Sequence, residues 1–187
     1  MRRRFQDVIR RAKQPRILWG YEDSNNEWRP RTRISDTAYI YCPERIRIAD
    51  NVFIGHYTIL DGTGTMAIEE GCQISAWVGI FTHSSHISIR LYGQHYQEIP
   101  EDEKKGYNAK PVSIGKYTYV GAGARIMPGV RVGKGVIISS NAIVTKHVRD
   151  FSVISGINNV VGDTRDVDKP YLDDLQLLKS YEEWQKK

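Results

Sequence analysis

The sequence predicts an all-β solenoid, in which short parallel strands wind as three-sided coils around a narrow apolar core. Two observations predict this fold: an unbroken six-residue repeat over residues 114–149, and the same pattern with an interruption over residues 34–84. A period of six fits neither an amphipathic helix, whose period is about 3.6 residues, nor a lone strand, whose period is about two. One short strand per hexad, with a tight turn after it, satisfies the pattern.

The first and fifth positions of the repeat define the expected interior. Between residues 114 and 149 every first position is a β-branched aliphatic residue: Ile114, Val120, Ile126, Val132, Ile138 and Val144. Every fifth position is small or β-branched: Thr118, Ala124, Val130, Val136, Ala142 and Val148. If three hexads close one coil, equivalent residues of successive coils stack at the strand spacing of about 4.8 Å. We therefore expect Ile114 beneath Val132, Val120 beneath Ile138 and Ile126 beneath Val144.

The upstream block follows the same pattern. Three hexads begin at Ile48, Ile54 and Leu60, and after a two-residue slip three more begin at Ile68, Ile74 and Ile80. The expected interior fifth positions are Val52, Thr58, Cys72, Val78 and Ser84. Ile34 and Ile40 can begin the array, so we expect the solenoid to occupy residues 34–160.

The repeat fails between Ile87 and Val112, where the sequence is long, polar and rich in acidic and lysine residues. A loop of this length inside a compact domain is usually functional or disordered. This one begins directly after His83 and His86. We therefore predict that residues 87–112 form a functional excursion from the coil.

The two ends of a solenoid need a cover, because open strand edges aggregate. Residues 1–33 are predicted as a basic arm that caps one end, with a helix whose small apolar face is formed by Phe5, Val8 and Ile9. Such a helix could also rest on an anionic membrane surface, where a basic side chain gains about 1 kcal/mol. Residues 161–187 are predicted as a C-terminal helical segment that opens at Pro170.

Composition narrows the function classes. The formal charge of +5 resides in the N-terminal arm, so the body of the chain is not a nucleic-acid binder by charge. The basic start is not followed by the apolar run of a secretory signal, and no stretch is long and apolar enough to span a membrane. Cys42 and Cys72 have no metal-ligand neighbours. The simplest interpretation is a cytoplasmic protein with reduced thiols, and a contact of the basic arm with the inner face of a membrane stays open.

Residues 34–156 resemble the hexapeptide-repeat acyltransferase superfamily, especially its sugar O-acetyltransferases of surface-polysaccharide and nodulation-factor type. The runs that carry the resemblance are IGKYTYVGAGARIMPGVRVGKGVIISSNAIVTKHV and GIFTHSSH. The resemblance implies a left-handed parallel β-helix, a homotrimer with active sites between subunits, and acetyl-coenzyme A along a groove beside the later coils. It implies acetylation of a carbohydrate hydroxyl, on an acceptor that could be lipid-linked, by direct transfer without a metal.

The same resemblance implies a histidine base at the start of the excursion, which maps to His86 or His83. The family often has T-x-S-H here, whereas this chain has Thr82-His83-Ser84-Ser85-His86, one residue longer. His86 is favoured because it keeps a Ser-His pair directly before the loop. Histidine suits a general base because its pKa lies near neutrality. Asp61 or another carboxylate could orient it.

Further site residues are expected from the later coils and from the excursion. Tyr119 stands where the family commonly has Trp and can still stack in the groove. Backbone groups near Gly121, Ala122, Ser139 and Ser140 could bind the pantetheine arm, and Lys146 could meet the coenzyme phosphates as a point charge. The aromatic candidates for binding a sugar face are Trp77, Tyr92, His95 and Tyr96.

Three alternatives stay open on the sequence. An N-acetyltransferase for amino sugars would share the fold and co-substrate. A γ-carbonic anhydrase would need three histidines on zinc, which the spacing of His56, His83 and His86 fits badly. A non-catalytic solenoid would leave the long excursion without a purpose, and an ice-binding one would need a threonine ladder that the sequence lacks.

Overall fold

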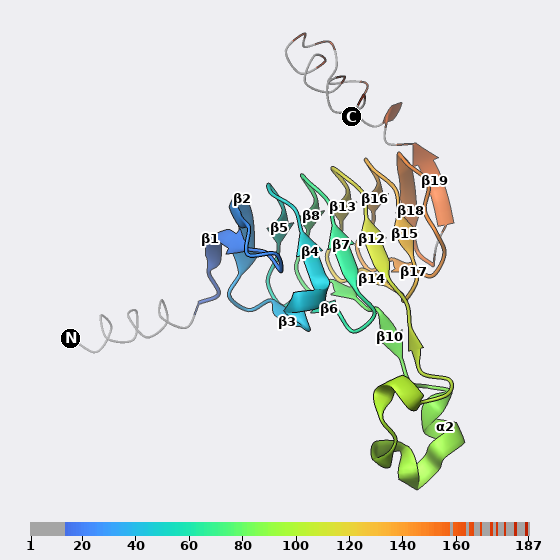
Figure 1. The fold of residues 1–187 in the computed structure, drawn as a ribbon. Helices are drawn as coiled ribbons and strands as arrows, with labels where there is room; N and C mark the ends of the chain where they lie inside the picture. The colour runs from blue at the N-terminus through green and yellow to red at the C-terminus, as the bar shows by residue number, and fades with distance from the viewer. Residues whose placement is uncertain are drawn as a thin grey trace, which may run out of the picture.

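The computed structural model describes residues 14–157, residues 159–163 and scattered positions between 165 and 186. Its centre is a three-sided prism of short parallel strands (Figure 1). Consecutive strands of the chain lie on consecutive faces of the prism, so each face is a sheet made from every third strand. One full turn of the chain around the prism is one coil.

Three sheets form the faces. Face 1 contains β2 (Trp28–Ser35), β5 (Phe53–Ile54), β8 (Gln73–Ile74), β13 (Tyr119–Val120), β16 (Ile137–Ile138) and β18 (Ser152–Ser155). Face 2 contains β3 (Tyr39–Tyr41), β6 (Ile59–Asp61), β9 (Gly79–Ile80), β14 (Arg125–Ile126) and β17 (Ile143–Val144). Face 3 contains β4 (Ile46–Ile48), β7 (Met66–Ile68), β12 (Val112–Ile114) and β15 (Arg131–Val132), and a short 3-10 helix, η1 (Pro43–Arg45), precedes β4.

The register between coils is the one that the hexads predict. Ile114 pairs with Val132, Val120 with Ile138 and Ile126 with Val144, all in parallel. The first- and fifth-position residues of residues 114–149 are all buried, from Ile114 at 0% exposure to Val148 at 6%. Burial of an isoleucine or valine side chain contributes on the order of 1.5–3 kcal/mol, so this stacked interior is the main source of stability.

The upstream block packs in the same way, with one correction. Ile48, Ile54, Leu60, Ile68, Ile74 and Ile80 are buried, as are Val52, Thr58, Cys72 and Val78. Ser84, however, is only half-buried and lies outside the prism, in β10 (His83–Ser84). The chain has already left the coil at this point, so Ser84 is not an interior residue.

The N-terminal end of the prism is extended by a hairpin that the sequence did not predict. Strand β1 (Ile17–Glu22) pairs antiparallel with β2, and β2 continues into face 1 by parallel pairing with β5. The parallel pairing of the solenoid begins within β2, at Arg33 and Ile34. At the other end β19 (Asn159–Asp163) pairs antiparallel with β18, so the chain is still a strand at residues 161–163.

The two helices predicted at the ends of the chain involve residues that the structure does not describe or describes only in part. The N-terminal helix with Phe5, Val8 and Ile9 lies outside the described residues, and the helix expected after Pro170 lies almost wholly outside them. Within the described part of the chain, no helix is long and apolar enough to cross a membrane.

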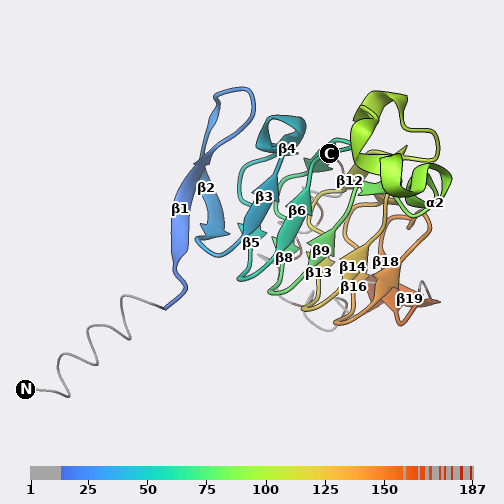
Figure 2. The same cartoon turned by 90° about the horizontal axis from the view of Figure 1, so that it is seen from below.

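The excursion forms a separate lobe on one corner of the prism (Figures 1 and 2). It leaves after β9 through β10 and returns through β11 (Asn108–Ala109), and these two strands pair antiparallel as a neck. The lobe itself contains α2 (Ser88–Tyr92) and two 3-10 helices, η2 (Gly93–Glu98) and η3 (Glu101–Glu103). The chain then rejoins the prism at β12, on face 3.

Candidate functional site

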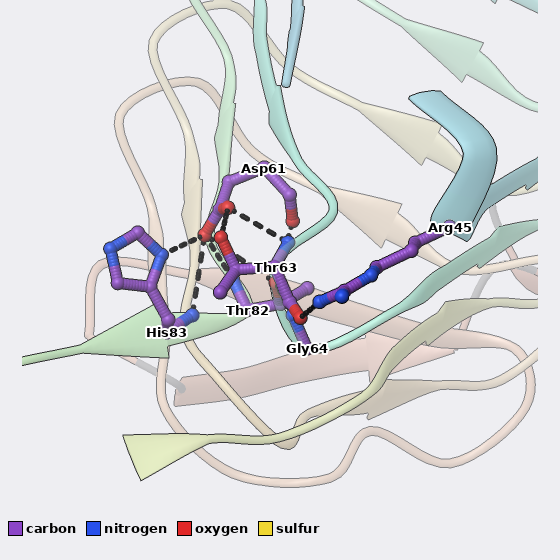
Figure 3. A network of polar contacts seen from close by, with 6 residues as sticks. All are labelled: Arg45, Asp61, Thr63, Gly64, Thr82 and His83. Atoms are coloured by element: carbon purple, nitrogen blue, oxygen red, sulfur yellow. Dashed lines mark hydrogen bonds and ion pairs between the residues drawn. The ribbon is translucent and has the colours of Figure 1, made fainter. Parts of the chain in front are cut away.

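A buried carboxylate and a histidine meet at the neck of the excursion. Asp61, the last residue of β6, places Oδ2 2.6 Å from Nδ1 of His83, the first residue of β10 (Figure 3). The Asp61 side chain is 5% exposed, whereas that of His83 is 36% exposed. One edge of the imidazole is thus held inside the protein while the ring remains accessible.

Several donors converge on the Asp61 carboxylate. Its Oδ2 accepts from the backbone N–H of Thr82 at 2.9 Å and of His83 at 3.2 Å. Its Oδ1 accepts from the Thr63 hydroxyl at 2.6 Å and the Thr63 N–H at 3.1 Å. Burial raises the pKa of Asp61, but these hydrogen bonds and the one from His83 outweigh burial and lower the pKa to about 2. The carboxylate is therefore ionised at neutral pH and only accepts hydrogen bonds.

This arrangement selects one tautomer of His83. Because Asp61 can only accept, Nδ1 of His83 donates, and in the neutral ring Nε2 then carries the lone pair. An imidazole with a free Nε2 and a carboxylate on Nδ1 is poised to remove a proton and to be stabilised once it carries the charge.

The corner that holds Asp61 is irregular. The two-residue slip in the repeat falls between β6 and β7, where Gly62 and Gly64 lie against neighbouring backbone: a Cβ on either would come within 2.6 Å of a main-chain atom. The Gly64 N–H donates to the Thr82 hydroxyl at 2.7 Å, and Nη1 of Arg45 donates to the Thr63 carbonyl at 2.9 Å (Figure 3). The slip therefore builds the corner that fixes Thr63, Thr82 and Asp61 together.

His86, which the sequence favoured as the base, has a different environment. Its side chain is exposed, and its Nδ1 lies 2.6 Å from the Ser84 hydroxyl. The carboxylate that could orient a base lies against His83 instead. Sequence reasoning named Asp61 only as one option, and the slip beside it was the signal that could have singled it out.

Tyr107 also belongs to this site, and sequence reasoning missed it. Its ring stacks on the His83 imidazole, with centroids 5.6 Å apart and ring planes inclined by 22°. Tyr107 lies on the return of the excursion, directly before β11. Its position follows from the pairing of β10 with β11. The sequence did not reveal this long-range contact.

The residues expected to bind the coenzyme are divided between two parts of the protomer. Tyr119 lies exposed on face 1, where its hydroxyl accepts from Ser75 Oγ at 3.2 Å. The Gly121–Ala122 and Ser139–Ser140 turns lie at the corner between faces 1 and 2, where Gly121 packs against the Ser140 N–H. Lys146 follows β17 and lies at the corner between faces 2 and 3.

Lys146 lines a basic hollow of about 620 Å³ on the later coils. Lys110, directly after β11, Arg131 and His147 line the same hollow, and no acidic residue is among its lining residues. Lys110 also joins this hollow to the site above, because its N–H donates to the Thr82 carbonyl at 2.8 Å. Lys110, Arg131 and His147 were not predicted from the sequence.

Of the four aromatic candidates for the acceptor, Tyr92, His95 and Tyr96 lie in the lobe, and Trp77 lies on the prism. Trp77 is exposed at the corner between faces 1 and 2, stacked on Tyr57, and not at the corner of His83. The Tyr92 hydroxyl accepts from the Lys105 N–H within the lobe, and His95 pairs with Glu98. Tyr96 lies beneath the Lys104 ammonium, 4.2 Å from its ring centroid. Among the described residues no cluster of three or more His, Cys, Asp or Glu could hold a metal ion.

Part of the chain matches a known family profile, and several known proteins are similar to it in sequence. The family profile described as bacterial transferase hexapeptide (six repeats) matches residues 111–146. A chloramphenicol acetyltransferase of Agrobacterium fabrum is 30% identical over 58% of this chain and 49% of its own length. Galactoside O-acetyltransferase of Escherichia coli is 26% identical over 74% of this chain and 66% of its own length. The chain spans about half the length of the first curated relatives it matches.

A solved structure has the same fold. The N-acyltransferase AntD from Bacillus cereus, in complex with dTDP and 3-hydroxybutyryl-CoA, superposes with a TM-score of 0.56 over 79% of this chain and 88% of its own, at 21% identity. The architecture is thus the left-handed parallel β-helix that the resemblance implied. The hexads and the stacked register of residues 114–149 thus agree with the match of residues 111–146 to the bacterial transferase hexapeptide family.

Proposed function

We propose that this protein is an acetyl-coenzyme A-dependent O-acetyltransferase that acts on a sugar hydroxyl, with His83 as general base. The observation that carries the proposal is the Asp61–His83 pair, 2.6 Å apart, with the carboxylate buried and the imidazole accessible. Of the two histidines that the sequence left open, His83 has the oriented, tautomer-fixed ring that base catalysis requires.

The chemistry needs few protein groups. Nε2 of His83 takes the proton of the acceptor hydroxyl as the hydroxyl oxygen attacks the thioester carbonyl carbon, and Asp61 stabilises the imidazolium that forms. Backbone N–H groups would have to face the oxygen on which negative charge develops. The C–S bond then breaks, and the coenzyme thiolate leaves as a good leaving group that the imidazolium can protonate. Cys72 is fully buried, and burial raises the pKa of its thiol to about 12, so it is not suited to be a nucleophile.

The basic hollow is our proposed site for the coenzyme phosphates. Lys110, Arg131 and Lys146 converge there, and lysine and arginine bind phosphate through charge-assisted hydrogen bonds. The hollow adjoins the neck that holds His83, since Lys110 is bonded to Thr82. The small residues at Gly121, Ala122, Ser139 and Ser140 lie on a different corner. We therefore propose that they contact a coenzyme bound between this protomer and a neighbour.

A homotrimer is part of the proposal. Face 2 carries exposed apolar side chains at Tyr39 and Ile59 on adjacent coils and at Ile143 on the coil of β17, and such a surface is typical of an interface. The relatives named galactoside O-acetyltransferase and chloramphenicol acetyltransferase support acetyl transfer as the reaction, and the former supports a sugar acceptor. An acceptor from surface-polysaccharide or glycoconjugate biosynthesis, free or lipid-linked, is the finer form of the proposal.

The test is release of coenzyme A thiol from acetyl-coenzyme A in the presence of a panel of sugars. The panel contains matched pairs that differ only in a hydroxyl or an amino group, and a His83→Ala variant serves as the control. We expect turnover with at least one hydroxyl sugar and its loss in the variant. Turnover confined to the amino sugars would establish the N-acetyltransferase alternative. Acetyl transfer that persists in the His83→Ala variant would remove the mechanism.

A further inference from the structure

We propose that Tyr107 is a positioning residue for the base: its ring holds the plane of the His83 imidazole and favours the imidazolium that forms during transfer. This inference rests on the proposed role of His83. The contact is direct, with the two rings stacked at a centroid distance of 5.6 Å and an angle of 22°.

Tyr107 is held firmly enough to act in this way. Its N–H donates to the Lys104 carbonyl at 3.1 Å, and β11 begins at the next residue. Gly106 before it has a φ of +75°, and a Cβ there would lie 2.6 Å from the Ile87 side chain, so the chain turns tightly against the start of the lobe. The pairing of Ala109 with His83 across the neck fixes the distance between the two segments.

Asp61 and Tyr107 restrain the imidazole in different directions. Asp61 fixes the Nδ1 edge of the ring, and Tyr107 covers one of its faces. Rotation about the Cβ–Cγ bond would break both contacts, so Nε2 keeps one direction. The negative face of an aromatic ring also attracts a cation whose centre lies within about 6 Å of the ring centroid. Tyr107 therefore stabilises the protonated ring more than the neutral ring.

The hydroxyl of Tyr107 is not expected to take part. Burial, and then the charges of Glu101, Tyr96, Asp61 and Tyr41, raise the pKa of Tyr107 to about 12, so the phenol is neutral at every working pH. Asp61 is the ionised group that contacts His83 from β6, and Glu101 faces Tyr107 from η3. Since neither charge changes when Tyr107 becomes Phe, phenylalanine should replace tyrosine fully.

The experiment measures kcat/KM for acetyl transfer against pH in the parent, Tyr107→Phe and Tyr107→Leu. Leucine keeps an apolar side chain in the lobe but removes the aromatic face. We expect Tyr107→Phe to match the parent. In Tyr107→Leu the acid limb of the profile should move about half a pH unit lower, because a base that loses a partner of its charged form releases its proton more readily. The plateau rate should fall about 2- to 5-fold.

A matched control separates stacking from the integrity of the lobe. Tyr92→Phe removes two hydrogen bonds within the lobe, from the Lys105 N–H at 2.9 Å and to the Glu103 carbonyl at 3.4 Å, and leaves the stack on His83 in place. We expect the acid limb of this variant to stay where the parent has it. The inference is overturned if Tyr107→Leu keeps the parent acid limb, or if Tyr107→Phe shifts as Tyr107→Leu does. Activity that survives His83→Ala would instead overturn the proposed function itself.

Discussion

At the scale of single residues, the site depends on one carboxylate whose charge is protected by hydrogen bonds. Asp61 accepts from Thr63, from two backbone N–H groups and from His83, and these bonds are possible only for the ionised form in its present geometry. The lowered pKa is thus a consequence of the same contacts that set the tautomer of the base. The proposed catalytic role of the pair and its contribution to local stability therefore have the same cause.

This coupling predicts how stability depends on pH. An aspartate whose pKa falls to about 2 on folding stabilises the protein above the pKa of the unfolded chain, about 3.9, and this contribution disappears as the pH falls through the folded value. We expect the free energy of unfolding to lose on the order of 1–2 kcal/mol from Asp61 between pH 4 and pH 2. In the Asp61→Asn variant, the free energy of unfolding should not show this contribution to its decline between pH 4 and pH 2. Denaturant titrations of both proteins at pH 5, 4, 3 and 2 measure it, and parallel curves would contradict the assignment.

At the scale of elements, the residues of the proposed site lie at the corners of the prism, whereas the pairing of the strands sets the register between coils. The regular hexads form strands of two residues, such as β14 and β17, in which the second residue is buried. The residues of the proposed site lie where the repeat is broken: at the two-residue slip before β7, and at the excursion between β9 and β12. The basic hollow lies where the excursion rejoins the later coils, lined by Lys110, Arg131 and Lys146.

The basic residues of the hollow lead to a prediction about the KM for acetyl-coenzyme A. Lys146→Ala and Lys110→Ala should raise KM for acetyl-coenzyme A about 10-fold with little change in kcat, because an exposed charge-assisted hydrogen bond to phosphate is worth about 1.5 kcal/mol in binding. Added salt should reduce the difference in KM between each variant and the parent, because salt screens the charges. Lys116→Ala is the control, since Lys116 lines a different hollow with Glu69 and Glu70. A loss of kcat at unchanged KM would contradict a phosphate site there.

The elements also show what the sequence could and could not predict. The hexads predicted the strands and their stacking, because a strict period leaves one way to bury Ile114, Val120 and Ile126. The β1–β2 hairpin was missed because Pro30 interrupts its second strand, and a proline normally argues against a strand. The structure accommodates it opposite the irregularity in register between Trp19 and Tyr21, where a missing N–H costs little.

At the scale of the whole molecule, the prism is a rigid support with one lobe attached at one corner. The stacked interior fixes β6 and β9 relative to each other, and that fixes Asp61 relative to the neck of the lobe. Asp61 and His83 could not be paired from the sequence, because they lie on successive coils on either side of an irregular corner. The sequence favoured His86 because Ser85 and His86 form a Ser-His pair directly before the loop, whereas the stacking of coils decides which residue lies beside a histidine in space.

The proposed base for the whole reaction is His83, oriented by Asp61. Its most direct test is kcat/KM for acetyl transfer near pH 7.5 in the parent, His83→Ala and His86→Ala, with thermal unfolding as a check that each variant is folded. We expect a loss of at least about 100-fold for His83→Ala, the usual contribution of a general base, and a value within about 3-fold of the parent for His86→Ala. The reverse order, or full activity in both variants, would contradict it.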